Sequence, residues 1–227
     1  MHIAEGYLPL VHCLGWGVLA GAHVWAGSRT QTPWRIPVGS TPREPVAALG
    51  PRAAYASAIA FGLLLTSLKM PSLAGSSSHP TGMALGTALL GPRRMAPVAL
   101  GILLLQALLL AHGGITTLGA NTWSLGVVCP WVTWGMWQLL RRLHLSDGVA
   151  LGTAAALGDL ATYAATAGQL AFAQRGAGVE MGAAWLSILG VFALTQLPIA
   201  AVEGVLTALA WRALAPERHP APALGNA

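Results

Sequence analysis

The sequence predicts an all-α, polytopic membrane bundle of about seven transmembrane helices. Its 227 residues are 55% hydrophobic and only 8% charged, whereas about a quarter of the residues in a soluble domain are charged. Several apolar runs approach the ~20 residues that a helix needs to cross a bilayer. These runs are continuous and rich in Leu, Ala and Gly, unlike the ~10-residue alternating segments of an outer-membrane barrel.

The apolar runs define the predicted crossings and the connections between them. We expect crossings at residues 8–27, 53–70, 81–90, 95–111, 122–140, 148–171 and 183–214. Polar or turn-rich loops at 28–52, 71–80 and 113–121 separate some of them. Residues 1–215 are predicted to form a single transmembrane domain, and residues 216–227 a disordered cytoplasmic tail.

The basic residues punctuate these runs and predict the orientation of the chain. With seven crossings, ten arginines fall on one side of the membrane and only Lys69 and Arg175 on the other. Positive charge marks the cytoplasmic side. The C-terminus is therefore expected in the cytoplasm of a bacterium, with the inner membrane as the location. The N-terminus and the loop that carries His79 are expected outside. The ten are Arg29, Arg35, Arg43, Arg52, Arg93, Arg94, Arg141, Arg142, Arg212 and Arg218.

The third crossing is unusually short. From His79 to Arg93 there are 14 steps, or about 21 Å as a helix, against a hydrocarbon core of about 30 Å. Either part of this segment is extended, or His79 sits below the outer surface. Non-helical backbone at that depth is tolerated where protein buries it or water reaches it.

The amino end carries a chelating pattern. If Met1 is retained with a free amine, that amine and the amide nitrogen of His2 close a five-membered ring around a metal ion. The same amide nitrogen and His2 Nδ1 close a six-membered ring. One further nitrogen would complete the square that Cu(II) and Ni(II) favour.

His79 is the best candidate for the fourth donor. It follows glycine and serines and precedes a proline, in Gly75-Ser-Ser-Ser-His-Pro-Thr-Gly82. Amide deprotonation requires an ion such as Ni(II), Cu(II) or Co(II), so binding releases protons and affinity should fall at low pH. The lack of an oxygen cage argues against Ca²⁺ or Mg²⁺. The predicted metal ligands are Met1, His2 and His79.

Polar residues in or beside apolar runs need a role, because each costs a few kcal/mol in hydrocarbon. They could orient the metal ligands or form helix-to-helix hydrogen bonds. For Asp159 and Glu203 we favour the structural role, and for Glu5, His112 and Asn121 both readings stay open. The candidate second shell is Glu5, Ser77, Ser78, His112 and Asn121.

Other function classes are disfavoured. The basic residues do not gather on a soluble domain, so nucleic acid is not an expected partner. Cys13 and Cys129 lie in apolar segments and predict buried thiols rather than a disulfide framework. The first residues lack the basic start and apolar core of a removable signal peptide. We expect no organic cofactor.

Five motifs in order along the chain resemble one known family, the CbiM/NikM substrate-capture subunits of cobalt and nickel energy-coupling-factor transporters. The resemblance covers nearly the whole chain. The motifs are Met1-His-Ile-Ala-Glu-Gly-Tyr-Leu-Pro9; Ser67-Leu-Lys-Met-Pro71 running into Gly75-Ser-Ser-Ser-His-Pro-Thr-Gly82; Leu109-Leu-Ala-His-Gly-Gly-Ile-Thr-Thr-Leu-Gly-Ala-Asn121; Leu157-Gly-Asp-Leu-Ala-Thr-Tyr163; and Thr195-Gln-Leu-Pro-Ile-Ala-Ala-Val-Glu-Gly204.

The resemblance implies capture of a divalent ion from outside by Met1, His2 and His79, with cobalt(II) or nickel(II) as the transported substrate. It implies membrane lipid and three kinds of protein as partners: a transmembrane coupling subunit, two cytoplasmic ATPases and a small accessory membrane subunit. It also implies a link to cobalamin biosynthesis. Ser77 stands where the family pattern leads us to expect a cysteine, which argues against a thiol ligand there.

Three alternatives stay open from the sequence. A nickel-specific subunit of the same class shares the motifs, and we favour cobalt only from overall likeness. An intramembrane hydrolase would use Ser76, Ser77 or Ser78 as nucleophile, His79 as base and Asp159 as orienter, but no oxyanion-hole motif is evident. A self-sufficient carrier is disfavoured because no inverted repeat or pair of broken helices is evident.

Overall fold

The computed structural model describes residues 2–30, 51–67, 70–71, 77–175, 178 and 180–214. Within them, α6, a π-helical stretch and α7 run on as one helix from Leu118 to Arg142. The elements are α1 (Leu10–Ser28), α3 (Pro51–Thr66), β1 (Met70–Pro71), β2 (Ser77–Ser78), α4 (Met83–Leu90), the 3₁₀ turn η2 (Pro92–Arg94), α5 (Met95–Leu109), α6 (Leu118–Trp123), the π-helical η3 (Ser124–Val128), α7 (Cys129–Arg142), α8 (Asp147–Ala173) and α9 (Met181–Leu214).

The described residues thus form seven helical segments, one at each predicted crossing. Three of them are long and apolar enough to cross a membrane by length and composition, namely Leu10–Ser28, Pro92–Leu109 and Met181–Leu214. Most of the α1 surface is open rather than packed in the protein. An apolar helix with that exposure is typical of a surface that faces lipid.

Two details differ from the sequence prediction. The helix expected from residue 122 begins four residues earlier, at Leu118, so that part of the predicted 113–121 loop is helical. Tertiary packing overrides the weak helix propensity of Gly119, because this glycine lies against α1: a Cβ on it would stand 2.4 Å from Gly17 Cα. The second difference is that the helix predicted at 53–70 ends at Thr66. Met70 lies instead in the short antiparallel pair of β1 with β2, where it aligns with Ser78.

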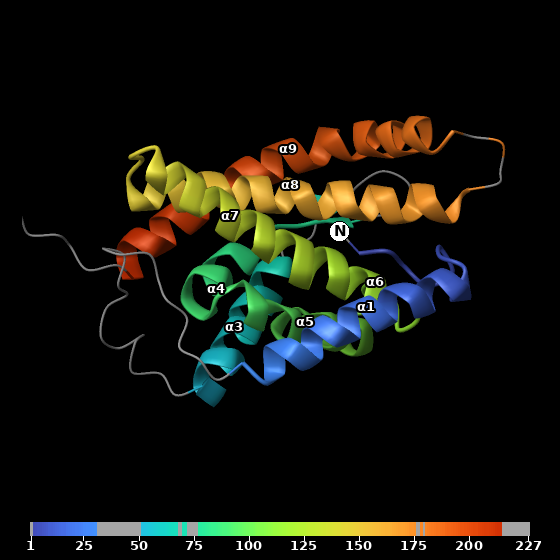
Figure 1. Ribbon diagram of the computed structural model, residues 1–227, viewed down its shortest axis with the longest axis horizontal. Helices are drawn as coiled ribbons and strands as arrows, with labels where there is room; N and C mark the ends of the chain where they lie inside the picture. Colours follow the sequence, from blue (N-terminus) through green and yellow to red (C-terminus); the bar gives the residue numbers. More distant parts are fainter. Residues whose placement is uncertain are drawn as a thin grey trace, which may run out of the picture.

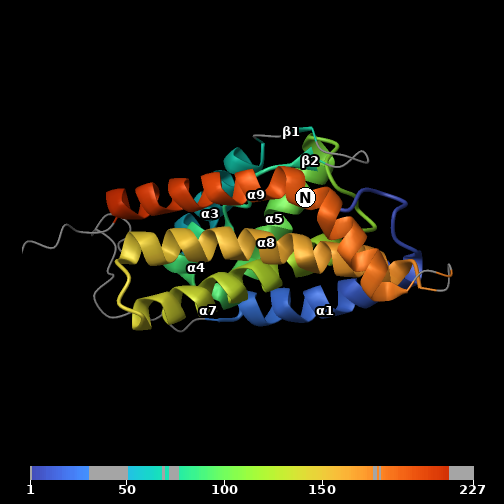
Figure 2. The ribbon, with the colours of Figure 1, turned by 90° about the horizontal axis from the view of Figure 1, so that it is seen from above.

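The long helices α8 and α9 form an antiparallel pair that runs the length of the molecule (Figure 1). In the second view α8 lies between α9 and the layer that contains α1 and α7 (Figure 2). The backbones of α8 and α9 approach closely at Gly152 and Gly204, where a Cβ on either would meet the other's carbonyl oxygen. Further along, the rings of Tyr163 and Phe192 pack edge to face, with centroids 6.0 Å apart.

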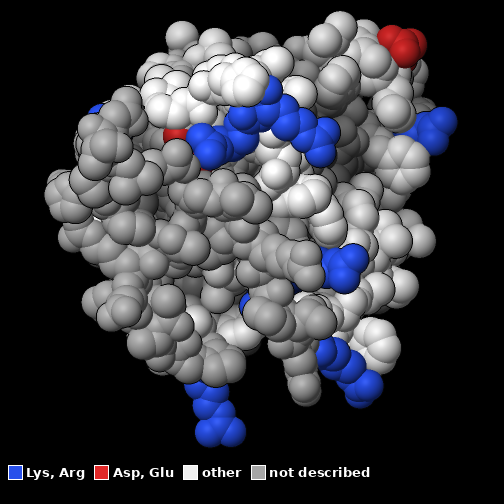
Figure 3. Space-filling view, turned by 60° about the vertical axis from the view of Figure 1, so that its left-hand side comes forward, with Lys and Arg blue, Asp and Glu red and all other residues white. Residues whose placement is uncertain are grey.

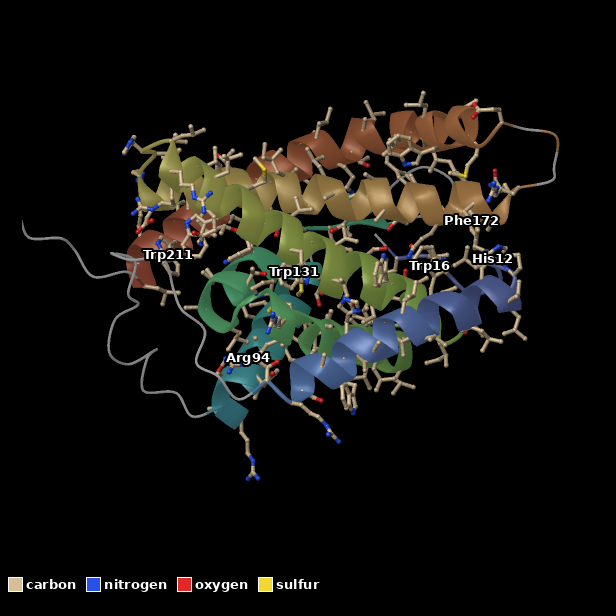
Figure 4. All side chains as sticks on the ribbon, in the orientation of Figure 1. His12, Trp16, Arg94, Trp131, Phe172 and Trp211 are labelled. Atoms are coloured by element: carbon tan, nitrogen blue, oxygen red, sulfur yellow. The ribbon has the colours of Figure 1, made fainter. Side chains whose placement is uncertain are left out.

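Several separate Lys or Arg side chains lie on the face of the molecule shown in Figure 3, and arginines occupy η2 and the last turns of α7 and α9. Figure 4 distinguishes two ends of the bundle. Arg94 and Trp211 lie toward one end, and His12 and Phe172 lie toward the other (Figure 4). Arg141 pairs with Asp147 at 2.6 Å, whereas Arg175 stacks on Phe172 at the far end. Lys69, the 31–50 segment and the 215–227 tail lie outside the described residues, and so do the predictions that concern them.

The contact between Gly152 and Gly204 generates a stability prediction. A Cβ at residue 152 would stand 2.6 Å from the Gly204 carbonyl oxygen and 2.9 Å from Ala208 Cβ, so Gly152→Ala should force α8 and α9 apart. We expect a loss of about 1–3 kcal/mol and a lower midpoint of thermal unfolding in detergent. Gly135→Ala is the control, since a Cβ there meets nothing within 4 Å. Equal midpoints for the two variants would contradict this packing.

Candidate metal centre

The segment ahead of α1 turns back into the bundle instead of extending from it (Figure 1). Ile3 and Leu8 are buried against Cys13 and Ala120. His2 is carried inward with them, and only 6% of its surface is exposed. The apolar residues that flank His2 therefore supply the hydrophobic free energy that holds this short segment in place.

The side chain of Asn121 clamps the segment that carries His2 by binding the backbone of Ile3. Its Oδ1 accepts from the Ile3 amide at 2.8 Å, and its Nδ2 donates to the Ile3 carbonyl at 3.0 Å. The Thr117 hydroxyl donates to the same carbonyl at 2.6 Å. All three residues are buried, so these bonds satisfy backbone groups that have no strand or helix partner. The clamp fixes the backbone one residue after His2.

Glu5 ties the same segment to the loop between α5 and α6. Its carboxylate accepts from the backbone amides of Ile115 at 2.9 Å and Thr116 at 3.2 Å, and from the Thr116 hydroxyl. The hydrogen bonds from Thr116 hold the pKa of Glu5 below its usual value, because they favour the charged form. Glu5 is exposed. It therefore holds the segment at the protein surface, whereas Asn121 holds it in the interior.

His79 is held by a turn that Glu203 organises. The Glu203 carboxylate accepts from the Thr81 amide and hydroxyl, each at 2.6 Å, and from the Gly82 amide at 3.0 Å. Gly82 has φ +67° and immediately precedes α4. The Glu203 carboxylate, which belongs to α9, therefore accepts hydrogen bonds from amides just before α4 that have no partner within that helix.

The third predicted crossing contains a helix of only eight residues, α4. That is about 12 Å, so the segment combines both explanations of its shortness: its first part is not helical, and His79 is completely buried. Protein surrounds this irregular backbone, as membrane-embedded loops require.

Three imidazoles meet at the centre of this arrangement. The ring centroids of His2 and His79 are 4.9 Å apart, those of His2 and His112 are 4.6 Å apart, and those of His79 and His112 are 5.5 Å apart. One nitrogen from each residue lies within 4.8 Å of the other two. The described residues hold no other group of three His, Cys, Asp or Glu side chains with this spacing.

The backbone around His112 adopts two uncommon conformations. Ala111 has φ +46° and Gly113 has φ +81°, and the left-handed region is unfavourable for a residue with a Cβ such as Ala111. The His112 amide donates to the Gln106 carbonyl at 3.1 Å, which closes the turn after α5. Gly113 then passes close to His2, since a Cβ there would stand 3.4 Å from His2 Cβ. The strained backbone at Ala111 thus places His112 beside the other two histidines.

The chemistry of the cluster fits a transition-metal ion. Burial lowers the pKa of His2 well below its usual value, so its ring is neutral and able to donate a lone pair. His79 Nδ1 lies 3.0 Å from the Pro80 carbonyl; a carbonyl only accepts, so that nitrogen carries the proton and Nε2 presents the lone pair. Neither His2 nitrogen makes a hydrogen bond of normal geometry with a described residue, although Gln106 interacts with the ring.

The other predicted residues are placed as follows. Glu5 and Asn121 hold the His2 segment, and His112 joins the cluster itself. Met1 and the side chains of Ser77 and Ser78 lie outside the described residues. Asp159 is fully buried and its carboxylate accepts no hydrogen bond from any described residue. It therefore does not orient His79 as the hydrolase hypothesis requires.

Sequence reasoning overlooked Gln106 and Thr117. Gln106 is fully buried in α5, donates to Thr66 Oγ1 at 2.6 Å and interacts with His2. An amide inside the apolar run 95–111 is a signal that could have been followed, because its cost in hydrocarbon needs an explanation. Thr117 offered no such signal, since threonine is common in helix starts and loops.

A bundle of apolar helices around buried imidazoles defines a class of protein: a membrane protein that handles a transition-metal ion. The family model described as "CbiM: Cobalt uptake substrate-specific transmembrane region" matches residues 2–221. The chain belongs to this family. It is a substrate-specific membrane component of cobalt uptake, a transporter rather than an enzyme, and the hydrolase hypothesis is wrong.

Individual relatives agree with the family. "Cobalt transport protein CbiM 1" of Pelobacter propionicus is 44% identical over 214 residues, which cover 94% of this chain and 90% of that protein. "Cobalt transport protein CbiM" of Kyrpidia tusciae is 44% identical over 209 residues, or 92% of this chain and 81% of that protein. A crystal structure of a "truncated transition metal transporter" shares the fold, with TM-score 0.76, 23% identity and coverage of 92% and 96%.

The Asn121 clamp generates a binding prediction. Asn121→Ala removes both bonds to Ile3 and frees the backbone next to His2, so we expect metal affinity to fall about 10–100-fold, the usual cost of losing an outer support of a metal site. Gln169→Ala is the matched control, because Gln169 is an equally buried amide that bonds only Ala120 and Ser124 among the described residues. Titration of both purified variants with Co(II) measures the difference, and an equal loss in both would refute a specific role for the clamp.

Proposed function

We propose that this chain captures Co(II) from outside the cell through four nitrogens: the Met1 amine, the His2 amide, His2 Nδ1 and a ring nitrogen of His79. The observation that carries this proposal is the burial of His2 beside His79 with ring centroids 4.9 Å apart, 77 positions apart in sequence. If Met1 is retained with a free amine, that amine lies within one residue of His2. Ni(II) is the alternative substrate, because four planar nitrogens suit it well.

The contacts around His2 are consistent with an ion that enters from solvent and is then shielded from solvent. The clamp at Asn121 and the exposed bonds of Glu5 close the segment over the cluster. Release of the ion then requires the segment or the bundle to move. In the energy-coupling-factor class that the motifs resemble, partner ATPases supply the energy for that movement.

We infer that the partners are those of an energy-coupling-factor importer: a transmembrane coupling subunit, two cytoplasmic ATPases and a small accessory membrane subunit. The names of the relatives in Pelobacter and Kyrpidia support cobalt transport. The arginines in η2 and in the last turns of α7 and α9 support a cytoplasmic C-terminus in a bacterial inner membrane, with the histidine-bearing segment outside. Supply of cobalt for cobalamin biosynthesis is the corresponding physiological role.

The ligand set generates three matched changes. His2→Ala, His79→Ala and acetylation of the Met1 amine each remove at least one nitrogen donor, so we expect metal affinity to fall by more than the roughly 100-fold that outer-support changes cost. The measurement is binding of Co(II) and Ni(II) to the purified full chain, with the intact mass confirming that Met1 is retained and unblocked.

His12→Ala serves as the control, since His12 lies at the far end of the bundle from Arg94 and outside the cluster (Figure 4). Undiminished binding by the acetylated chain would exclude the Met1 amine as a ligand. Undiminished binding by His79→Ala would exclude the proposed fourth donor.

A further inference from the structure

The third histidine has a geometry that the four-nitrogen plane does not use. His112 contacts both other rings nearly edge-on, at interplanar angles of 69° to His2 and 67° to His79. It is half-buried, and it reaches this place through the unfavourable φ of Ala111. A side chain that merely filled space would not need three mutually close nitrogens.

Ring separations indicate where each imidazole would stand around one ion. A nitrogen ligand lies about 2.0–2.1 Å from the ion, and the centre of its ring about 1.1 Å further out. Two rings at right angles then have centroids about 4.4 Å apart, and two opposite rings about 6.2 Å apart. The observed 4.6 and 4.9 Å place the His2 ring beside each of the other two, whereas the 5.5 Å between His79 and His112 falls between the adjacent and opposite values.

This spacing leaves one kind of position for His112. In the proposed plane, His2 Nδ1 and His79 are adjacent corners, and the Met1 amine and the His2 amide fill the other two. With all four corners filled, a further donor beside the His2 ring can only lie above or below the plane. We propose that His112 is an axial fifth donor that makes the site favour Co(II) over Ni(II). This inference rests on the proposed function, since it uses that plane.

The electronic structures of the two ions explain the preference. Square-planar Ni(II) has a filled orbital along the axis, so an axial imidazole is repelled. Low-spin Co(II) has one electron fewer and its unpaired electron occupies that orbital, so it accepts an axial nitrogen. A fifth donor therefore adds affinity for Co(II) and little for Ni(II). The specificity is set by a residue outside the chelating amino end.

The test compares the full chain with His112→Phe, which keeps an aromatic ring in the edge contacts but has no donor. We expect the affinity for Co(II) to fall about tenfold, or about 1.4 kcal/mol, and the affinity for Ni(II) to change by less than about threefold. His112→Ala checks that the result does not depend on the new ring. His23→Ala is the control, because His23 lies on α1 with its Nδ1 against the Leu19 carbonyl. Equal loss for both ions would overturn the inference.

Electron paramagnetic resonance of the Co(II)-loaded protein under argon separates this inference from the proposed function. A low-spin signal with triplet splitting from one axial ¹⁴N, lost in His112→Phe, supports the axial donor. A low-spin signal without that splitting, or with splitting that survives the substitution, overturns the axial donor and leaves the four-nitrogen plane intact. A high-spin signal, or no binding at all, overturns the plane itself and the axial donor with it.

Discussion

The clamp between Asn121 and the Ile3 backbone is the interaction on which the proposed metal centre depends. A chain end normally frays, because few contacts offset the entropy of ordering it. Here two amide-to-backbone hydrogen bonds and one from Thr117 hold residue 3 inside the bundle. As a result, the His2 ring lies against the rings of His79 and His112. Without the clamp, the site would consist of two histidines contributed by loops and a mobile chain end.

The opposite wall of the site depends on one carboxylate. Glu203 binds the amides that begin α4, and in doing so it fixes the turn directly after His79. The eight-residue α4 could not stand in a membrane alone, because its first amides would lack partners. Long helices such as α9 therefore supply the rigid frame, and the proposed ligands His2, His79 and His112 lie on short irregular segments that this frame holds.

The positions of the helices followed closely from the sequence, since apolar runs and arginine pairs mark them. The meeting of His2 with His79 also followed, because both were predicted on one side of the membrane and the structure buries them together. The start of α6 did not follow, because the contact between Gly119 and Gly17 is tertiary and glycine in a sequence predicts a loop.

Roles that depend on which way a side chain points were harder to predict. Asn121, Glu5 and His112 were candidates, but whether each faces the metal or a neighbouring helix is decided by backbone angles such as those of Ala111 and Gly113. Glu203 was expected to be structural, and it does form bonds between segments; its importance lies in which segment it holds, the one that carries His79. No residue pattern along the chain specifies that pairing across 122 positions.

X-ray absorption at the cobalt edge of the loaded full chain tests the central claim most directly, because it counts the atoms around the ion. The account predicts a first shell of nitrogen only, at about 2.0 Å, with the outer-shell scattering of at least two imidazole rings. A shell dominated by oxygen or sulfur, or one without imidazole scattering, would contradict it.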